Sequence, residues 1–222
     1  LSKRRDTNRF EQLLEQYDFI RESAAFKIAL PQDDYTCSAI LDRWMVDWCM
    51  DIVFPGCVND WDVLYPKYSQ YGRFCQGYTG YISDHLIDRA KAVKPIPKRT
   101  IDVSYRAASL SPEFGRLGLV KSEIGNRFSL RADGTGLQLD ISTNPNDTIL
   151  GTKWYDFVEN SKCMLGVNSG SSLIDPEGEI GIAVYRFLQR NPRATFEEVE
   201  AACFSGLDGK YEFTAISPRN LE

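Results

Sequence analysis

Short apolar runs alternate with helix-periodic segments along most of this chain, and that alternation constrains its fold more than any other feature. Phe26 to Leu30 is a β-compatible run that ends at Pro31, and a helical segment joins it to a second run, Asp51 to Phe54. Two strands connected in this way lie parallel, with their carboxyl ends at one sheet edge. The second half repeats the pattern with strands expected at 101–105, 137–141 and 162–167. We therefore predict an α/β fold with parallel sheets in both halves.

Helical periodicity is clear between these runs, where apolar residues recur at intervals of three and four. The helices expected on this basis are 10–17, 36–48, 81–93, 117–128, 152–158, 180–190 and 195–203. Thr195 and Glu198 form the pattern of a capping box at the start of the last helix. Residues 59–80 are rich in aromatic residues and glycine without a clear period, so we expect a structured loop region with short helical turns there.

The best candidate for a linker is Lys91 to Thr100, which contains two prolines and four basic residues. We place a domain boundary within it, so that residues 1–95 form one domain and 96–222 a second. The chain begins at Leu1 and not at Met, which leads us to expect that the first domain is incomplete.

Composition excludes several kinds of site. The net charge of −5 argues against a broad electrostatic grip on nucleic acid. The six cysteines contain no CxxC pair and His85 is the only histidine, so we expect neither a metal site nor a catalytic triad. No apolar run approaches the roughly 20 residues of a membrane-spanning helix.

The stretch Leu165 to Ile180 is the strongest candidate for a ligand loop, because small residues there join an expected strand to an expected helix. Backbone N–H groups and hydroxyls in such a loop can bind phosphates or sugars. The candidate binding residues are Asn168, Ser169, Gly170, Ser171 and Ser172. Among the carboxylates that follow, Asp175 fits a helix cap better than a ligand contact. Glu177 and Glu179 suit the vicinal hydroxyls of a ribose or a sugar.

Two basic residues are candidates for a diphosphate. Arg106 follows an expected strand, and Lys121 lies one to two turns into the next helix, so both can point at the carboxyl edge of the sheet. Taken singly, each fits a solvated surface residue better than a phosphate ligand. In the first half, Gln32, Asp33 and Asp34 follow a strand and are candidates to contact an acceptor or an ion, although a turn or capping role for Asp33 or Asp34 fits at least as well.

From about Phe26 onward the chain resembles a group of bacterial glycosyltransferase-like proteins of GT-B architecture, met in surface-polysaccharide gene contexts. The segments that carry the resemblance are IALPQDDY, LYP, IDVSYRAASL, GRLGLVKSEIG, ILGTKWYDFVENSKCMLGVNSGSSLIDPEGEI, NPRATFEEVE and the terminal ISPRNLE. Their order and spacing weigh more than any single motif.

The resemblance implies two Rossmann-like domains facing across a cleft, with the acceptor side in residues 1–95 and the nucleotide-sugar site in 96–222. It implies transfer of a sugar from a nucleotide-diphosphate donor to an acceptor hydroxyl, with retention and without a metal or other cofactor. Arg106, Lys121 and Glu177 would be the catalytic residues. The acceptor would be a saccharide or a lipid-linked saccharide, and the protein would be cytoplasmic, with peripheral contact to the inner membrane face left open.

Two other functions remain open at this point. The chain could be a non-catalytic module that binds a nucleotide or a sugar with the same fold. It could also be a sheet-based scaffold within a larger assembly.

Overall fold

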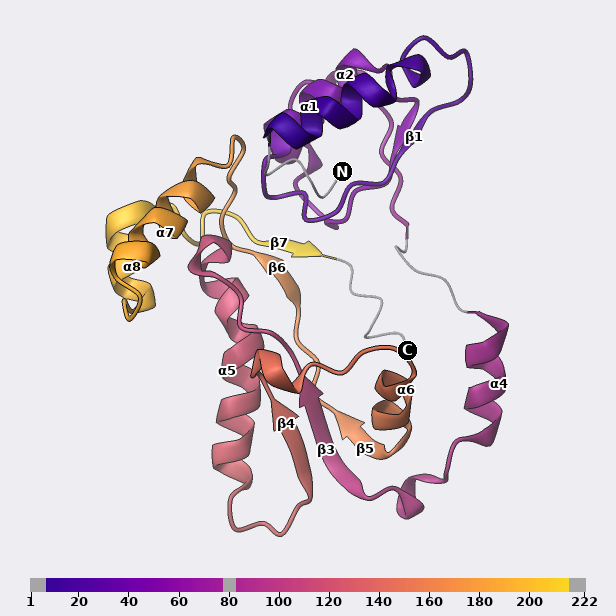
Figure 1. The fold of residues 1–222 in the computed structure, drawn as a ribbon, viewed down its shortest axis with the longest axis vertical. Coiled ribbons are helices and arrows are strands. Elements are labelled where there is room, and N and C mark those ends of the chain that lie inside the picture. The colour runs from indigo at the N-terminus through magenta and orange to yellow at the C-terminus, as the bar shows by residue number, and fades with distance from the viewer. Residues whose placement is uncertain (1–6, 78–82, 216–222) are drawn as a thin grey trace. The chain divides into compact units, whose positions relative to one another are not determined.

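The computed structural model describes residues 7–77 and 83–215 (Figure 1). It is a mixed α/β structure with parallel strand pairs, which confirms the predicted class. Residues 81–82, at the expected start of the third helix, and the terminal ISPRNLE motif lie outside the described residues.

The chain folds into two compact units, and both are built from separate chain segments. The first unit holds the described residues up to 77, Pro112–Leu117 and the residues from Ser169 onward. The second holds the described residues from 83 to Ser111, and Gly118–Asn168. This division differs from the single boundary expected at residue 95, because late segments of the chain hydrogen-bond to early ones. The Cys37 N–H, for example, donates to the Asp175 carbonyl at 2.7 Å.

The early part of the first unit contains the predicted βαβ arrangement. The strands β1 (Ile28–Ala29) and β2 (Ile52–Val53) pair in parallel, with Ile28 opposite Ile52 and Ala29 opposite Val53. Helix α2 (Ser38–Asp47) connects them, after α1 (Thr7–Gln16) and the 3-10 helix η2 (Asp18–Ile20). In the described part of the aromatic region that follows, residues 59–77, the helical turns are α3 (Trp61–Leu64) and η3 (Tyr68–Gln70), as its lack of period predicts.

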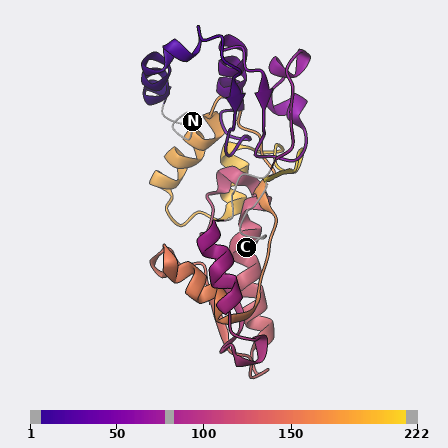
Figure 2. The ribbon, with the colours of Figure 1, turned by 90° about the vertical axis from the view of Figure 1, so that its right-hand side faces the viewer.

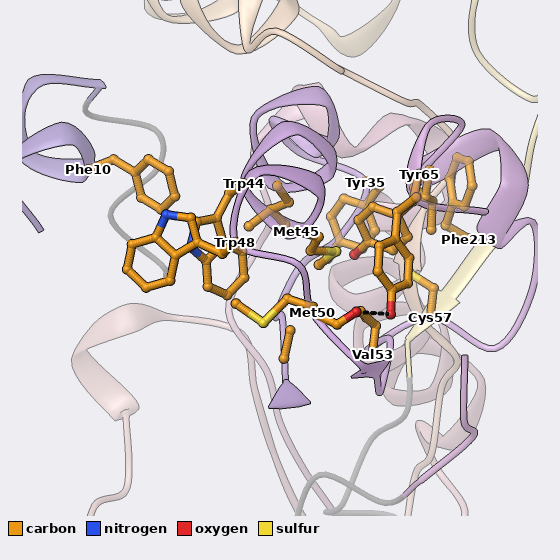
Figure 3. Packing of buried hydrophobic residues seen from close by; sticks show 14 residues of the cluster. Phe10, Tyr35, Trp44, Met45, Trp48, Met50, Val53, Cys57, Tyr65 and Phe213 are labelled. Atoms are coloured by element: carbon orange, nitrogen blue, oxygen red, sulfur yellow. Dashed lines mark hydrogen bonds between the residues drawn. The ribbon is translucent and has the colours of Figure 1, made fainter. Parts of the chain in front are cut away.

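A large aromatic core holds this part of the first unit together. Trp44 of α2 and Trp48, directly after this helix, lie with ring centroids 5.8 Å apart, and Phe10 of α1 packs beside them (Figure 3). Tyr65 and Phe213 are fully buried in the same cluster, which therefore joins residues almost 150 positions apart in the chain. The aromatic content of the sequence is thus explained in large part by packing.

The late part of the first unit contains a short pair of strands and the two helices that lie between them in the chain. The strands β6 (Ser169–Ser171) and β7 (Phe213–Ala215) pair antiparallel. Helices α7 (Glu179–Arg190) and α8 (Phe196–Cys203) lie where they were expected, and α8 begins at the predicted capping box. A second core of Leu173, Val184, Val199 and Phe204 packs between them. The 3-10 helix η5 (Pro112–Phe114) belongs to this unit as well.

The second unit is a parallel three-stranded sheet with the order β4-β3-β5. Its elements are α4 (Asp84–Ala92), η4 (Ile96–Lys98), β3 (Ile101–Arg106), α5 (Gly115–Ala132), β4 (Leu139–Ser142), η6 (Pro145–Asp147), α6 (Thr152–Glu159) and β5 (Ser161–Met164). Helix α5 begins in the first unit and continues in this one.

Helices α5 and α6 cover opposite faces of the sheet in the second unit. Tyr105 of β3 donates its hydroxyl proton to the Lys121 carbonyl of α5 at 2.8 Å. The next residue, Arg106, lies over the Phe157 ring of α6 at 4.8 Å. Because consecutive side chains of a strand point to opposite faces, the two helices lie on different sides, as Figure 2 also shows. Burial raises the pKa of the Tyr105 phenol to about 12.

Candidate functional site

The carboxyl edge of the three-stranded sheet is the place in the second unit where a ligand would be expected. The first strand, β3, lies in the middle, β4 is on one side of it and β5 on the other. The helices that follow β3 and β4, α5 and α6, lie on opposite faces of the sheet, and open parallel sheets bind ligands where the strand order reverses in this way. Residues 107–111 follow β3 and residues 165–168 follow β5. The Leu165 N–H still donates to the Ser104 carbonyl at 3.0 Å, so 166–168 come directly after the edge.

Arg106 lies at this edge as predicted, but its guanidinium is used within the unit. Nη2 forms an ion pair with Asp140, and Nη1 donates to the carbonyls of Tyr105 and Asp140 at 2.9 and 3.0 Å. Nε donates to the Asp147 carbonyl at 3.3 Å. Arg106 therefore joins β3, β4 and η6, and its predicted role as a phosphate ligand stays a prediction. Lys121 is in the same unit, half-buried on α5.

The prediction that residues 168–172 form a loop is wrong, because the middle of this segment is the strand β6. Gly170 packs against β7 so closely that a Cβ atom there would collide with the Phe213 carbonyl oxygen. The Ser171 hydroxyl accepts from the Leu173 N–H at 3.1 Å. These residues are buried in the first unit, whereas Asn168 is exposed at the end of the second.

Ser172 belongs to a polar cluster around the start of α5. Its hydroxyl accepts from the Leu117 N–H at 3.1 Å and donates to Asp208 at 2.6 Å. The Asp208 carboxylate also accepts from the Arg116 N–H at 3.3 Å. An acidic side chain thus occupies the position where a Rossmann-type protein binds a phosphate at its first helix. The sequence offered no signal for this contact, since Asp208 is more than 90 residues from Arg116.

The three carboxylates after the loop divide into separate roles. Asp175 is buried and caps α7, because its two oxygens accept from the N–H groups of Ile180 and Gly181 at 3.1 and 2.8 Å. This confirms the cap expected for it. Glu177 makes a bidentate pair with Arg43 at 2.8 and 3.1 Å, and that hydrogen bond lowers the pKa of the Glu177 carboxyl. Glu179 is exposed in the first turn of α7.

The first unit brings the early and late candidate segments together. The Asp175 N–H donates to the Tyr35 carbonyl at 2.9 Å. Tyr35 lies two residues after Asp33 in the chain. Gln32 and Asp33 are exposed, and the Asp33 carboxylate accepts from the Tyr35 hydroxyl at 3.1 Å. Gln32 and Asp33 were expected in the first domain and Asp175 in the second, yet all three lie in one unit. Arg106 and Lys121 belong to the other unit.

Asp34 is the third candidate of the group that follows β1. Its side chain is fully buried, and it accepts from the N–H groups of Gly56 and Cys57 at 2.7 and 3.3 Å. It thereby joins the segments that follow β1 and β2. Burial, followed by the negative charge of Asp34, raises the pKa of the Cys57 thiol. The signal was present, since an Asp-Asp pair follows one parallel strand and Pro-Gly follows the other.

The described residues contain neither a metal-binding cluster nor a helix that could span a membrane. Within 7–77 and 83–215, no three side chains of His, Cys, Asp or Glu are grouped so that they could hold a metal ion. Over the same ranges, every helix is too short or too polar to cross a bilayer.

The chain gives no significant match to a family model, to a curated protein or to a solved structure.

Proposed function

We propose that this chain is part of a nucleotide-sugar-dependent glycosyltransferase whose donor binds at the carboxyl edge of β3 and β5. The finer architecture in this proposal is GT-B-like, with two Rossmann-like domains. The strand order β4-β3-β5 carries the proposal, because it places a topological switch point between β3 and β5. The motif resemblance supplies the reaction class.

The segments at this edge have the chemistry that a sugar diphosphate needs. Residues 107–111 offer small side chains and the hydroxyls of Ser109 and Ser111, and residues 165–168 end in the exposed amide of Asn168. N–H and O–H donors of this kind stabilise the charge that develops on a departing diphosphate. In the reaction, the acceptor oxygen bonds to the anomeric carbon, the bond from that carbon to the diphosphate oxygen breaks, and the acceptor's proton passes to the departing diphosphate.

The predicted catalytic residues fit this proposal in different ways. Arg106 holds the ends of β3 and β4 in place, so it acts first as a positioning residue and contacts the diphosphate only if its pair with Asp140 opens. Lys121 would contribute positive charge from α5. Glu177 pairs with Arg43 and belongs to the first unit, so its predicted catalytic role stays a prediction. A cytoplasmic location and a saccharide or lipid-linked acceptor belong to the same proposal.

A second function, non-catalytic binding of a nucleotide or a sugar, is favoured by one observation. Two of the three side chains expected to do chemistry, Arg106 and Glu177, are engaged in ion pairs within their own units. A module that kept the sheet edge without the chemistry would tolerate such pairing.

Calorimetric titration with UDP, GDP and their sugars tests both functions, together with an assay for released nucleoside diphosphate. Asn168→Trp places a large ring at the carboxyl edge, and Asn126→Trp, on the exposed side of α5, is the matched control. We expect nucleotide binding that Asn168→Trp abolishes and Asn126→Trp leaves unchanged.

Turnover supports the glycosyltransferase, and binding without turnover supports the module. If no nucleotide binds, or if Asn168→Trp binds as well as the unmodified chain, both functions at this edge are refuted.

A further inference from the structure

The amino edge of the sheet in the second unit carries exposed cations together with exposed aliphatic side chains. Strand β3 begins after η4, and β4 begins after the turn that follows α5. The two strand starts lie side by side, because the Asp102 N–H donates to the Gln138 carbonyl at 2.8 Å. Both Figure 1 and Figure 2 show η4 and the carboxyl end of α5 at this end of the unit. We call this surface the basic tip, and its residues are Lys94, Ile96, Lys98, Arg127, Leu130 and Arg131.

The four cations of the basic tip are exposed, and none of them forms an ion pair within residues 7–77 and 83–215. Two carboxylates near the strand starts are already paired, Asp102 with Lys162 and Glu159 with Arg89, both at 2.6 Å. Asp133, in the turn after α5, adds one exposed carboxylate. The tip therefore has a surplus of positive charge, although the whole chain has a net charge of −5.

The helix that contains two of these cations does not by itself explain them. Cations near the carboxyl end of a helix are favoured by its dipole, but Arg127 and Arg131 are four residues apart and repel each other. The dipole of α5 also has no bearing on Lys94 and Lys98, which lie in or beside η4. Leu130, 79% exposed, is three residues from Arg127 on the same side of the helix. An anionic surface would stabilise all four cations together.

Ile96 is 56% exposed on a segment whose backbone needs little water. It lies between Pro95 and Pro97, which have no N–H group. The N–H groups of Lys98 and Arg99 donate to the carbonyls of Pro95 and Ile96 at 2.9 and 3.1 Å. Unpaired backbone donors are what make it costly to move a loop into a less polar medium. The segment is therefore suited to place Ile96 at the boundary between lipid headgroups and acyl chains.

We propose that the basic tip binds the surface of an anionic phospholipid bilayer. The cations lie at the lipid phosphates, and Ile96 and Leu130 insert between the headgroups. Electrostatic attraction and buried apolar area together hold such peripheral surfaces on a membrane. Nucleic acid would attract the same cations, but contacts to its phosphate backbone leave the exposed aliphatic side chains without a role.

The inference does not depend on the proposed glycosyltransferase activity. The donor is proposed to bind at the carboxyl edge of β3 and β5, and the basic tip is at the opposite end of the same strands.

Co-sedimentation of the full chain with vesicles tests the proposal. Vesicles of phosphatidylcholine alone are compared with vesicles in which about one third of the lipid is phosphatidylglycerol. We expect binding to the anionic vesicles only, and we expect it to weaken as salt is added, because salt screens the attraction.

Lys94→Gln combined with Lys98→Gln removes two cations from the tip. Lys153→Gln combined with Lys210→Gln is the matched control, because both of these lysines are exposed and lie outside the tip. We expect the first pair of substitutions to weaken binding to anionic vesicles at least about tenfold and to reduce its salt dependence. The control pair should leave the affinity within about twofold.

Leu130→Ser separates insertion from charge, since it should weaken binding and leave the salt dependence unchanged. A chain that does not bind anionic vesicles, or that binds phosphatidylcholine vesicles equally well, overturns the proposal. So does a Lys94→Gln, Lys98→Gln variant that keeps its circular dichroism spectrum and binds as tightly as the control. Tighter binding to duplex DNA than to anionic vesicles would also overturn it and would assign the basic tip to nucleic acid.

Discussion

Replacing Arg106 by alanine is the sharpest test of how the sheet of the second unit is held together. Its guanidinium donates to Asp140 and to three backbone carbonyls, and it lies 4.8 Å from the Phe157 ring centroid. The side chain is only 16% exposed. One alanine substitution therefore removes contacts to β4, η6 and α6 together.

The magnitude follows from these contacts. A hydrogen bond to a charged group contributes about 1.5–3 kcal/mol, and a cation–π contact at a partly exposed site about 0.5–1 kcal/mol. Asp140 is 38% exposed, so water can solvate its carboxylate after the arginine is removed and the penalty stays below that of a buried unpaired charge. We expect Arg106→Ala to lower the free energy of unfolding by about 3 kcal/mol.

Arg116→Ala is the matched control. Arg116 has more ionic partners, with Glu197, Glu200 and Asp208 at 3.5, 3.0 and 3.7 Å, but its side chain is 57% exposed. Exposed ion pairs contribute little, so we expect a loss of about 1 kcal/mol or less.

Urea unfolding followed by far-UV circular dichroism gives both values, and hydrogen exchange of residues 101–106 and 139–142 shows whether the loss is in this sheet. If Arg106→Ala lowers the free energy of unfolding no more than Arg116→Ala does, burial does not explain the difference expected between the two arginines.

Two further predictions concern the first unit. Glu177 has a pKa lowered from its ordinary value of 4.5 by Arg43, so the pair stabilises the fold above that pH and this stability is lost as pH falls through the lower, folded-state value. Both side chains are about half exposed, so the pair contributes less than about 1 kcal/mol to the free energy of unfolding. The urea midpoint of Glu177→Gln should differ from that of the unmodified chain at pH 7 and match it at pH 2. Gly170→Ala should cost at least about 2 kcal/mol, because its Cβ meets the Phe213 carbonyl oxygen. Gly134→Ala, with no atom within 4 Å of the added carbon, should cost only the roughly 1 kcal/mol of its positive φ. Equal melting temperatures for these two variants would contradict the packing argument.

Local patterns predicted most helices and the parallel strand pairs. The apolar spacing of α7 and the capping box at Thr195 depend on residues three or four positions apart, so the chain itself contains the whole signal. The same holds for β1, α2 and β2, where the strand runs and the intervening helix define a βαβ unit.

Long-range pairing decided what the sequence interpretation missed. Ser169–Ser171 has the composition of a loop, and it becomes a strand only because Phe213–Ala215 pairs with it. In the same way, Lys91 to Thr100 has the composition of a linker, yet hydrogen bonds such as that from Cys37 to Asp175 assign residues from both ends of the chain to one unit.

The candidate site shows the same division. The sequence alone determined that Arg106 ends a strand at a sheet edge and that Asp175 caps a helix, because both follow from position within an element. Only the tertiary structure decided which groups these side chains meet: Asp140 for Arg106, Arg43 for Glu177 and the start of α5 for Asp208. Ion pairs and buried hydrogen bonds join residues far apart in the chain, and no local period records them.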